Sequence, residues 1–124
     1  MKFRFTVFAL LLGALQANAE MTLNDGVYTK AQAAAGKISY EKNCKACHNA
    51  EFYKEKFQSW NQAPLIEFYD LISATMPQNA PGSLALQEYT DALAYIFNML
   101  GYPPGDKTLS HEDGSMEDIL IVTD

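Results

Sequence analysis

The 124-residue sequence predicts an all-α fold, in which about three helices form one domain. Two segments carry apolar residues at helical spacing, and a third opens with a helix-capping signature. No segment alternates apolar and polar residues in the manner of a half-buried β-strand. The length is typical of one domain and excludes a large enzyme built from separate cofactor and substrate domains.

Residues 1–19 have the pattern of a secretory signal peptide. Lys2 and Arg4 precede an apolar run over residues 5–15, and the small residues around Ala19 fit the cleavage rule. The run is too short to cross a bilayer core, which requires about 20 helical residues. We therefore expect cleavage after Ala19 and export to the periplasm, with no membrane span in the mature chain. The alternatives are an uncleaved anchor or a core helix.

The sequence is acidic, with a formal net charge of −6 and a pI near 4.8. Such a chain lacks the basic surface that phosphate contacts need, so nucleic acid is excluded as a partner. From Glu20 onward the chain has 105 residues, 7 Lys and 15 Asp+Glu, and thus a charge of −8. A domain of this size is marginal on its own apolar core and often needs a disulfide, a metal or a cofactor.

The first expected helix follows an irregular lead-in over residues 20–28. Thr29 and Gln32 form a capping-box signature, in which each side chain would bond to the other residue's backbone N–H. Gly36 and Tyr40 are four residues apart and therefore share one helix face. A glycine inside a helix costs about 1 kcal/mol relative to alanine. We expect Gly36 to be present because it lets another helix approach closely.

The middle of the chain predicts one further helix. Residues 49–63 read as a polar and aromatic connection. Pro64 suits the first position of a helix, and the apolar spacing that follows predicts a short amphipathic helix over 64–74. Met76 lies just before Pro77, which pushes it out of the helical region and ends the helix. A loop follows.

The strongest helical periodicity lies over residues 86–100. Its apolar stripe consists of Tyr89, Ala92, Leu93, Ile96, Phe97 and Leu100. Gly101 suits the left-handed position that commonly ends a helix. The acidic tail, residues 106–124, carries a short apolar patch near its end. We expect His111 in this tail to be solvated and Met116 to be mobile.

The segment Cys44-Lys45-Ala46-Cys47-His48, called the CxxCH segment below, matches the signature of c-type haem attachment. Two thiols three positions apart at a helix start can form thioethers with the two vinyl groups of one haem. The imidazole of His48 would then be the proximal ligand of the iron. Covalent attachment keeps haem c bound in an open compartment, where a dissociable haem could be lost.

The two cysteines have three other interpretations. A thioredoxin-type redox pair belongs in a βαβ setting, and no strands are expected here. A structural zinc site needs four ligands, whereas the sequence has one cysteine pair. A plain disulfide is compatible with an oxidising compartment. The export signal and the absence of other cysteines favour haem attachment.

Met76 is the preferred sixth ligand of the iron. It lies 28 residues after His48, in a turn fixed by Pro77 that can aim the side chain inward. The alternative is that Met76 only fills an apolar gap, which is the usual role of methionine. Met99 lies on the amphipathic helix and is expected to pack. His/Met ligation raises the reduction potential and leaves no open iron position, which favours an electron relay over a reaction centre.

Four features occur together along the chain. Gly36 and Tyr40 stand eight and four residues before Cys44. They are followed by the CxxCH segment, by Thr75-Met76-Pro77, and by the run that extends from Glu88-Tyr89 through Ala94-Tyr95-Ile96 to Gly101-Tyr102-Pro103. In this combination the chain resembles the class I c-type cytochromes over residues 26–105. The domain is therefore expected to occupy residues 20–105, ahead of the acidic tail.

The resemblance implies a cytochrome c fold around one covalent haem c. It implies attachment through Cys44 and Cys47, and axial ligation by His48 and Met76. It also implies that the N-terminal helix crosses the C-terminal one, with Gly36, Tyr40 and Tyr95 at the crossing. Trp60 would line the haem and donate its indole N–H to a propionate, or else belong to the core.

The function implied by the resemblance is electron transfer, not enzyme catalysis. The residue pattern of the C-terminal half is similar to that of cytochromes that serve periplasmic quinoprotein dehydrogenases of bacteria. The implied partners are redox proteins: such a dehydrogenase as donor, and an oxidase or another cytochrome as acceptor. The alternatives are a haem enzyme or gas sensor in which Met76 is displaceable, and a haem-free CxxC thiol oxidoreductase.

The sequence departs from the family pattern at three places. Asn49 stands where glycine is common after the histidine. No proline occurs between His48 and Ala63, so another backbone carbonyl must accept the ring N–H that a metal-bound histidine normally donates. Ala85 replaces a serine that caps the last helix in related sequences, unless Ser83 substitutes for it.

Lysines are concentrated around the CxxCH segment. Six of the seven that follow residue 19 are Lys30, Lys37, Lys42, Lys45, Lys54 and Lys56. Residues 30–56 therefore sum to +3, whereas residues 106–124 sum to −5. We hypothesise that this asymmetry steers docking on an acidic patch of a partner. The alternative is that the lysines simply solvate a helix face.

Overall fold

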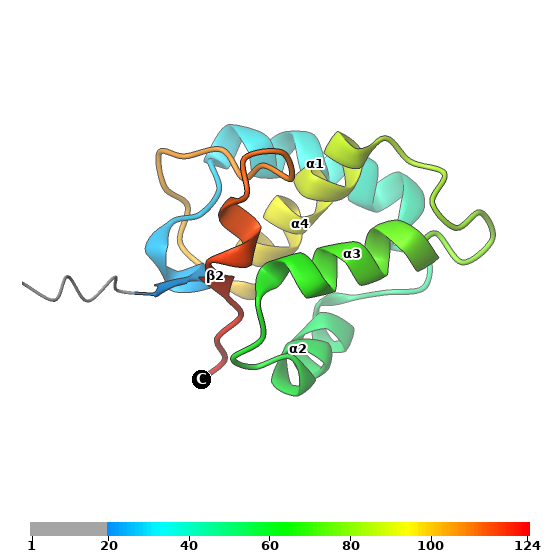
Figure 1. Cartoon of the computed structure of the whole chain (residues 1–124). Helices are drawn as coiled ribbons and strands as arrows, with labels where there is room; N and C mark the ends of the chain where they lie inside the picture. The colour runs from blue at the N-terminus through cyan, green and yellow to red at the C-terminus, as the bar shows by residue number, and fades with distance from the viewer. Residues whose placement is uncertain (1–19) are drawn as a thin grey trace, which may run out of the picture.

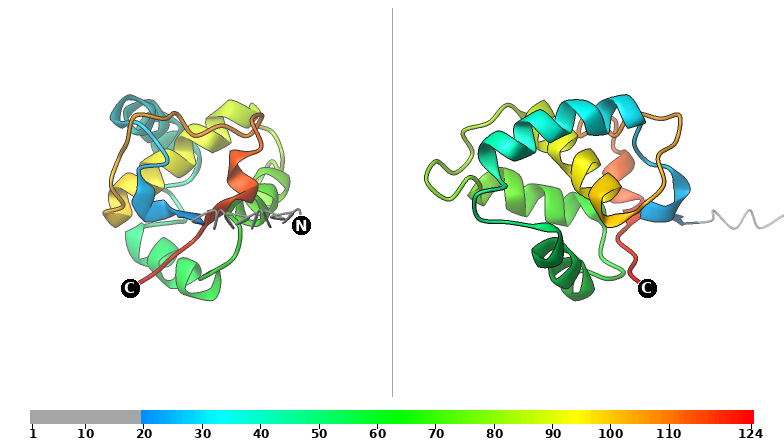
Figure 2. Two further views of the ribbon diagram at one scale, coloured as in Figure 1. Left: turned by 60° about the vertical axis from the view of Figure 1, so that its left-hand side comes forward. Right: turned by 180° about the vertical axis from the view of Figure 1, so that it is seen from behind.

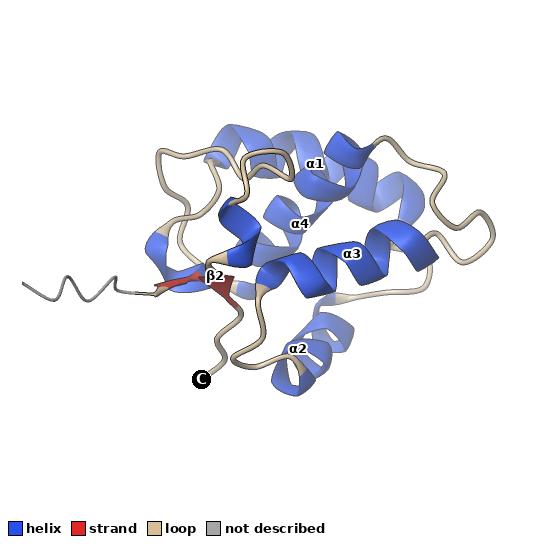
Figure 3. Cartoon of the chain, in the orientation of Figure 1, coloured by secondary structure: helices blue, strands red, loops and turns tan. Residues whose placement is uncertain are grey.

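The structure, a computed structural model, describes residues 20–124, and helices dominate it (Figure 3). The four α-helices are α1 (Lys30–Asn43), α2 (Ala50–Ser59), α3 (Leu65–Thr75) and α4 (Leu86–Leu100). The predicted all-α class is confirmed, with one helix more than the expected three. None of the described helices is long and apolar enough to cross a membrane. The predicted signal peptide lies outside the described residues.

Helices α1 and α4 pack directly on each other (Figures 1 and 2). Gly36 on α1 lies so close to α4 that an added Cβ would overlap the backbone carbonyl of Asp91. One turn further along α1, the ring of Tyr40 packs on that of Tyr95, with centroids 5.1 Å apart. The expectation that Gly36 permits a close helix approach is confirmed.

The start of α1 is capped as expected in one direction only. The Thr29 side chain accepts a hydrogen bond from the Gln32 N–H, at 3.1 Å. The Gln32 side chain does not return to Thr29. Its amide instead donates to the Leu109 carbonyl and accepts from the Leu109 N–H, both at 2.8 Å. Gln32, which the local sequence predicts to cap α1, therefore binds the distant backbone of Leu109 instead.

Helix α2 was not predicted, since residues 49–63 were expected to form an irregular connection. Asn49 caps it by accepting a hydrogen bond from the Phe52 N–H, at 2.9 Å. Tyr53 and Phe57, four residues apart, are its buried residues. The three residues between them, Lys54, Glu55 and Lys56, are all charged and hide this apolar face from a composition-based interpretation. The cap also gives Asn49 a structural role.

Helices α3 and α4 lie close to their predicted bounds. Pro64 is the residue before α3 rather than its first helical residue, and Met76 ends the helix as expected. Helix α4 spans the predicted residues, and Gly101 follows it in the left-handed conformation, with φ of 90°. The described residues contain one small sheet, in which β1 (Met21–Thr22) pairs in parallel with β2 (Ile119–Leu120).

The N-terminus of α4 lacks a side-chain acceptor because Ala85 occupies the cap position. Ala85 has the extended backbone of a cap residue, and its N–H donates to the Glu88 carboxylate at 2.9 Å. We therefore expect Ala85→Ser to complete the capping box and to stabilise the protein by about 0.5–2 kcal/mol. Denaturant unfolding measures this gain. Ser83→Ala is the control, because the Ser83 side chain does not cap α4. A change of the same size in the unfolding free energy of this variant would contradict the assignment of residue 85 as the cap position.

The acidic tail is part of the folded body, contrary to the expectation that Met116 is mobile. Its apolar side chains are buried: Leu109, Met116, Ile119 and Ile121. His111 is not solvated either, because its side chain is only 12% exposed. The His111 ring stacks on Tyr69, and its Nδ1 lies 3.2 Å from the Thr90 hydroxyl.

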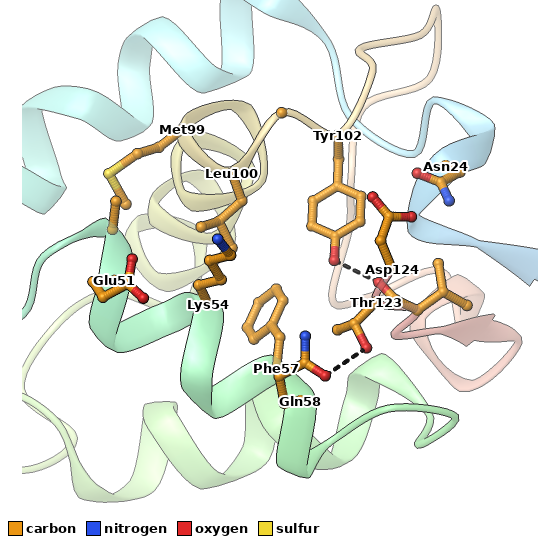
Figure 4. A pocket seen from close by; sticks show the side chains of 13 residues that line it. Asn24, Glu51, Lys54, Phe57, Gln58, Met99, Leu100, Tyr102, Thr123 and Asp124 are labelled. Carbon is orange, nitrogen blue, oxygen red and sulfur yellow. Dashed lines mark hydrogen bonds between the residues drawn. The ribbon is translucent and has the colours of Figure 1, made fainter.

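The last residues of the chain are tied to α2 and to the end of α4 (Figure 4). The Tyr102 hydroxyl donates to the Val122 carbonyl at 2.5 Å. The Thr123 hydroxyl donates to the side-chain oxygen of Gln58 at 3.3 Å. These bonds and the β1–β2 pairing place the tail against both the beginning and the middle of the described chain.

Candidate functional site

The candidate site is a cavity of about 870 Å³ within the described residues. Cys44, Cys47, His48 and Met76 all line it. The structure therefore brings the methionine to the same cavity as the CxxCH segment, from which it is separated in sequence by helices α2 and α3. The volume lies within the roughly 300–1,000 Å³ that is typical of cofactor and ligand pockets.

The cavity wall is mainly apolar and comes from all four helices and the loop before α4. Its apolar side chains are Ala46, Phe52, Tyr53, Trp60, Phe68, Leu71, Ile72, Pro77, Leu84, Tyr89, Ala92 and Ile96. Trp60, for which both a cofactor-lining and a core role were considered, lies in this wall with its ring 5.4 Å from Phe68. Such a wall suits a flat, apolar ligand.

The CxxCH segment forms a turn after α1 rather than the start of a helix. The N–H groups of Cys47 and His48 both donate to the Cys44 carbonyl, at 3.2 and 3.0 Å. Both thiols are free, with Cys44 half-buried and Cys47 exposed. Because α1 has already ended at Asn43, the expectation of thiols at a helix start is wrong. The turn nonetheless directs both cysteines and the histidine to one cavity.

His48 is held by aromatic residues of α1 and α2. The Tyr40 hydroxyl donates to the His48 carbonyl at 2.6 Å. The imidazole stacks on Phe52, with ring centroids 4.0 Å apart, and meets the edge of Tyr53. Burial, together with the charge of Lys56, holds the pKa of His48 below its ordinary value. His48 is therefore neutral at pH 7, which is the form that binds metals.

The buried Nδ1 atom of His48 has no hydrogen-bond partner within residues 20–124. The backbone carbonyl that the sequence predicts as acceptor of its ring N–H is therefore not found. An imidazole nitrogen buried in this way costs free energy unless a bound group supplies a partner. With two thiols and a thioether on the same cavity, the donor set fits a covalently attached haem.

Met76 is fixed through its backbone at the end of α3. Its N–H donates to the Ile72 carbonyl at 2.9 Å. Its own carbonyl accepts hydrogen bonds from the Gly82 N–H at 3.2 Å and from the Tyr89 hydroxyl at 2.5 Å. The helical spacing predicts Tyr89 only as a member of the apolar stripe of α4. No local pattern could reveal that its hydroxyl reaches a residue on another element.

Positive charge at the cavity comes from two of the six lysines that surround the CxxCH segment. Lys42 and Lys56 line the cavity. The Nζ atom of Lys37 instead lies 4.0 Å from Oε1 of Glu41, in an exposed ion pair on α1. Two of the six lysines around the CxxCH segment therefore line the cavity itself.

Two competing interpretations of the cysteines find little support in this geometry. Within the described part of the chain, no three His, Cys, Asp or Glu side chains are grouped to hold a metal ion. Burial raises the pKa of the Cys44 thiol, whereas reactive CxxC cysteines have a lowered pKa.

Comparison with protein-family models, with curated proteins and with solved structures gave no match.

Proposed function

We propose that this protein is a mono-haem c-type cytochrome that carries single electrons in the periplasm. The observation that supports the proposal best is the meeting of Cys44, Cys47, His48 and Met76 on one apolar-walled cavity. These are the four residues that covalent attachment and His/Met ligation require.

Each of these residues has a defined role in the proposal. Cys44 and Cys47 would hold the haem through two thioether bonds, and His48 and Met76 would ligate its iron. The haem supplies one-electron Fe(III)/Fe(II) chemistry. The apolar wall excludes water and surrounds the haem with a low dielectric, which together with the thioether ligand favours the reduced state. No side chain needs to transfer a proton.

We also propose that the four helices adopt a cytochrome c fold. The packing of α1 on α4 supports this assignment, because Gly36, Tyr40 and Tyr95 meet where the family resemblance expects a helix crossing. The additional helix α2 lies between the CxxCH segment and α3 and contributes Phe52 and Tyr53 to the wall.

An electron carrier fits the site better than a haem enzyme or a gas sensor. Those functions need an open or easily opened iron position, whereas Met76 lines the cavity with its backbone held by three hydrogen bonds. The proposed partners are redox proteins, with a quinoprotein dehydrogenase as donor and an oxidase or another cytochrome as acceptor. The pattern of residues 1–19 supports periplasmic localisation.

We expect the double variant Cys44→Ala/Cys47→Ala to lose all covalently bound haem. With full-length protein produced in a host that attaches haem c, haem staining after denaturing electrophoresis should be positive for the wild type and negative for the variant. The matched control is Ser39→Ala on α1, which leaves both thiols in place. A wild-type band without haem stain would refute the proposal and favour the thiol oxidoreductase.

We expect Met76→Leu to open the sixth iron position. The variant should lose the weak Met–iron absorption band of the oxidised protein and should bind carbon monoxide readily when reduced. Met99→Leu is the control, because Met99 lines a different hollow, beside Tyr102. Ready carbon monoxide binding by the wild type would contradict an electron carrier and would favour the gas sensor or haem enzyme.

A further inference from the structure

The loop that carries Met76 projects from the body of the molecule between α3 and α4 (Figure 1). Residues 78–83 are all exposed, so apolar burial does little to hold them. Within the loop, Ala80 donates to the Pro77 carbonyl at 2.9 Å, and Ser83 donates to the Ala80 carbonyl at 3.2 Å. These bonds shape the loop but do not attach it to another element.

One side chain of α4 attaches this loop at both ends. The Tyr89 hydroxyl donates to the Met76 carbonyl at 2.5 Å and accepts from the Leu84 N–H at 3.4 Å. Tyr89 is only 4% exposed, and its ring lines the cavity. Among the hydrogen bonds of residues 20–124, no other side chain from outside the loop bonds to residues 76–84.

We infer that Tyr89 is a positioning residue, whose hydroxyl fixes the Met76 backbone so that the thioether stays directed at the cofactor. The inference rests on the proposed function, because it concerns the ligand role of Met76. It adds a determinant of that ligation which lies on α4, outside both the CxxCH segment and the loop.

The Tyr89 hydroxyl is the main restraint that joins the loop to α4. Without the hydroxyl, the Met76 carbonyl would keep only the Gly82 N–H, which belongs to the same exposed loop. The Leu84 N–H would lose its acceptor as well. The loop could then move without breaking any bond to α4, and the thioether would leave the iron more often.

The first test is Tyr89→Phe, which removes the hydroxyl and keeps the buried ring. The hydrogen bonds of a phenol contribute enough to shift the balance between Met-bound and Met-free states by roughly three- to tenfold. We expect the reduced variant to bind carbon monoxide roughly three- to tenfold more tightly. Its Met–iron band should weaken, and its reduction potential should fall.

Tyr102→Phe is the matched control. It removes a phenol-to-carbonyl hydrogen bond of the same 2.5 Å length, to Val122, at a site that does not line the cavity. This variant should lose a comparable amount of stability without a change in carbon monoxide affinity. Equal effects of the two variants on that affinity would overturn the inference, because general loosening would then explain both.

A double-mutant cycle tests whether Tyr89 acts through Met76. In a Met76→Ala background the sixth position is already open, so adding Tyr89→Phe should leave the carbon monoxide affinity unchanged. A further three- to tenfold increase in that background would show that the hydroxyl acts on the cavity in some other way, and would overturn the inference.

A second measurement needs no cofactor signal. Tyr89→Phe should speed hydrogen exchange at the amides of residues 78–84, whereas Tyr102→Phe should not. Unchanged exchange there would overturn the anchoring role. The proposed function fails by a different result, namely a wild-type protein without covalent haem or with ready carbon monoxide binding, so the two failures are distinguishable.

Discussion

Removal of residues 106–124 is expected to unfold the protein. Four side chains of this tail are buried: Leu109, Met116, Ile119 and Ile121. Burying one such side chain contributes about 1.5–3 kcal/mol, so their loss removes about 6–12 kcal/mol. A domain is commonly stable by only about 5–15 kcal/mol in total. Circular dichroism of the truncated protein should show loss of the cooperative thermal transition.

The shorter truncation that removes only residues 123–124 is the control. It deletes the exposed bonds of Thr123 to Asn61 and Gln58, at 3.0 and 3.3 Å. Such bonds contribute little at the surface, so we expect the unfolding free energy to fall by less than about 1 kcal/mol. A protein without residues 106–124 that unfolds at the wild-type midpoint would show that the tail is a separate appendage.

Gly36→Ala is expected to destabilise the protein by about 2–3 kcal/mol. The new Cβ would overlap the Asp91 carbonyl, which belongs to the backbone of α4 and cannot rotate away as a side chain would. The helices must separate, and overpacking of this kind typically costs about 1–3 kcal/mol. Denaturant unfolding measures the change.

The sign of this effect makes the test decisive. At an uncrowded helix position, replacing glycine with alanine stabilises by about 1 kcal/mol. Ala34→Gly, at an exposed position of the same helix, measures the difference in helix propensity between alanine and glycine, and it should destabilise the protein by about 1 kcal/mol. Stabilisation by Gly36→Ala would mean that α1 and α4 are further apart in solution than described here.

Features that depend only on nearby residues of one helix were predictable from the sequence. The apolar stripe of α4 and its terminal Gly101 fixed both ends of that helix. The glycine inside α1 indicated a close crossing before any partner helix was known. These predictions succeeded because spacing and backbone preference act over a few residues.

Features that depend on distant contacts were missed. The charged residues of α2 conceal the buried pair Tyr53 and Phe57, so its helical face was taken for a connection. The acidic tail predicts a solvated His111 and a mobile Met116. Contacts with distant residues hold this tail instead, since Leu109 bonds to Gln32 and β2 pairs with β1. The turn at Pro77 and the family resemblance both predict that Met76 faces the CxxCH segment, whereas the role of the Tyr89 hydroxyl had no sequence signal.

The parallel pairing of β1 with β2 joins residues that are almost the whole described chain apart, since Met21 pairs with Ile119. Contacts of such long sequence separation carry a large loop-closure entropy, and they form late. The pairing of β1 with β2 is therefore expected to be among the last contacts to form when the domain folds.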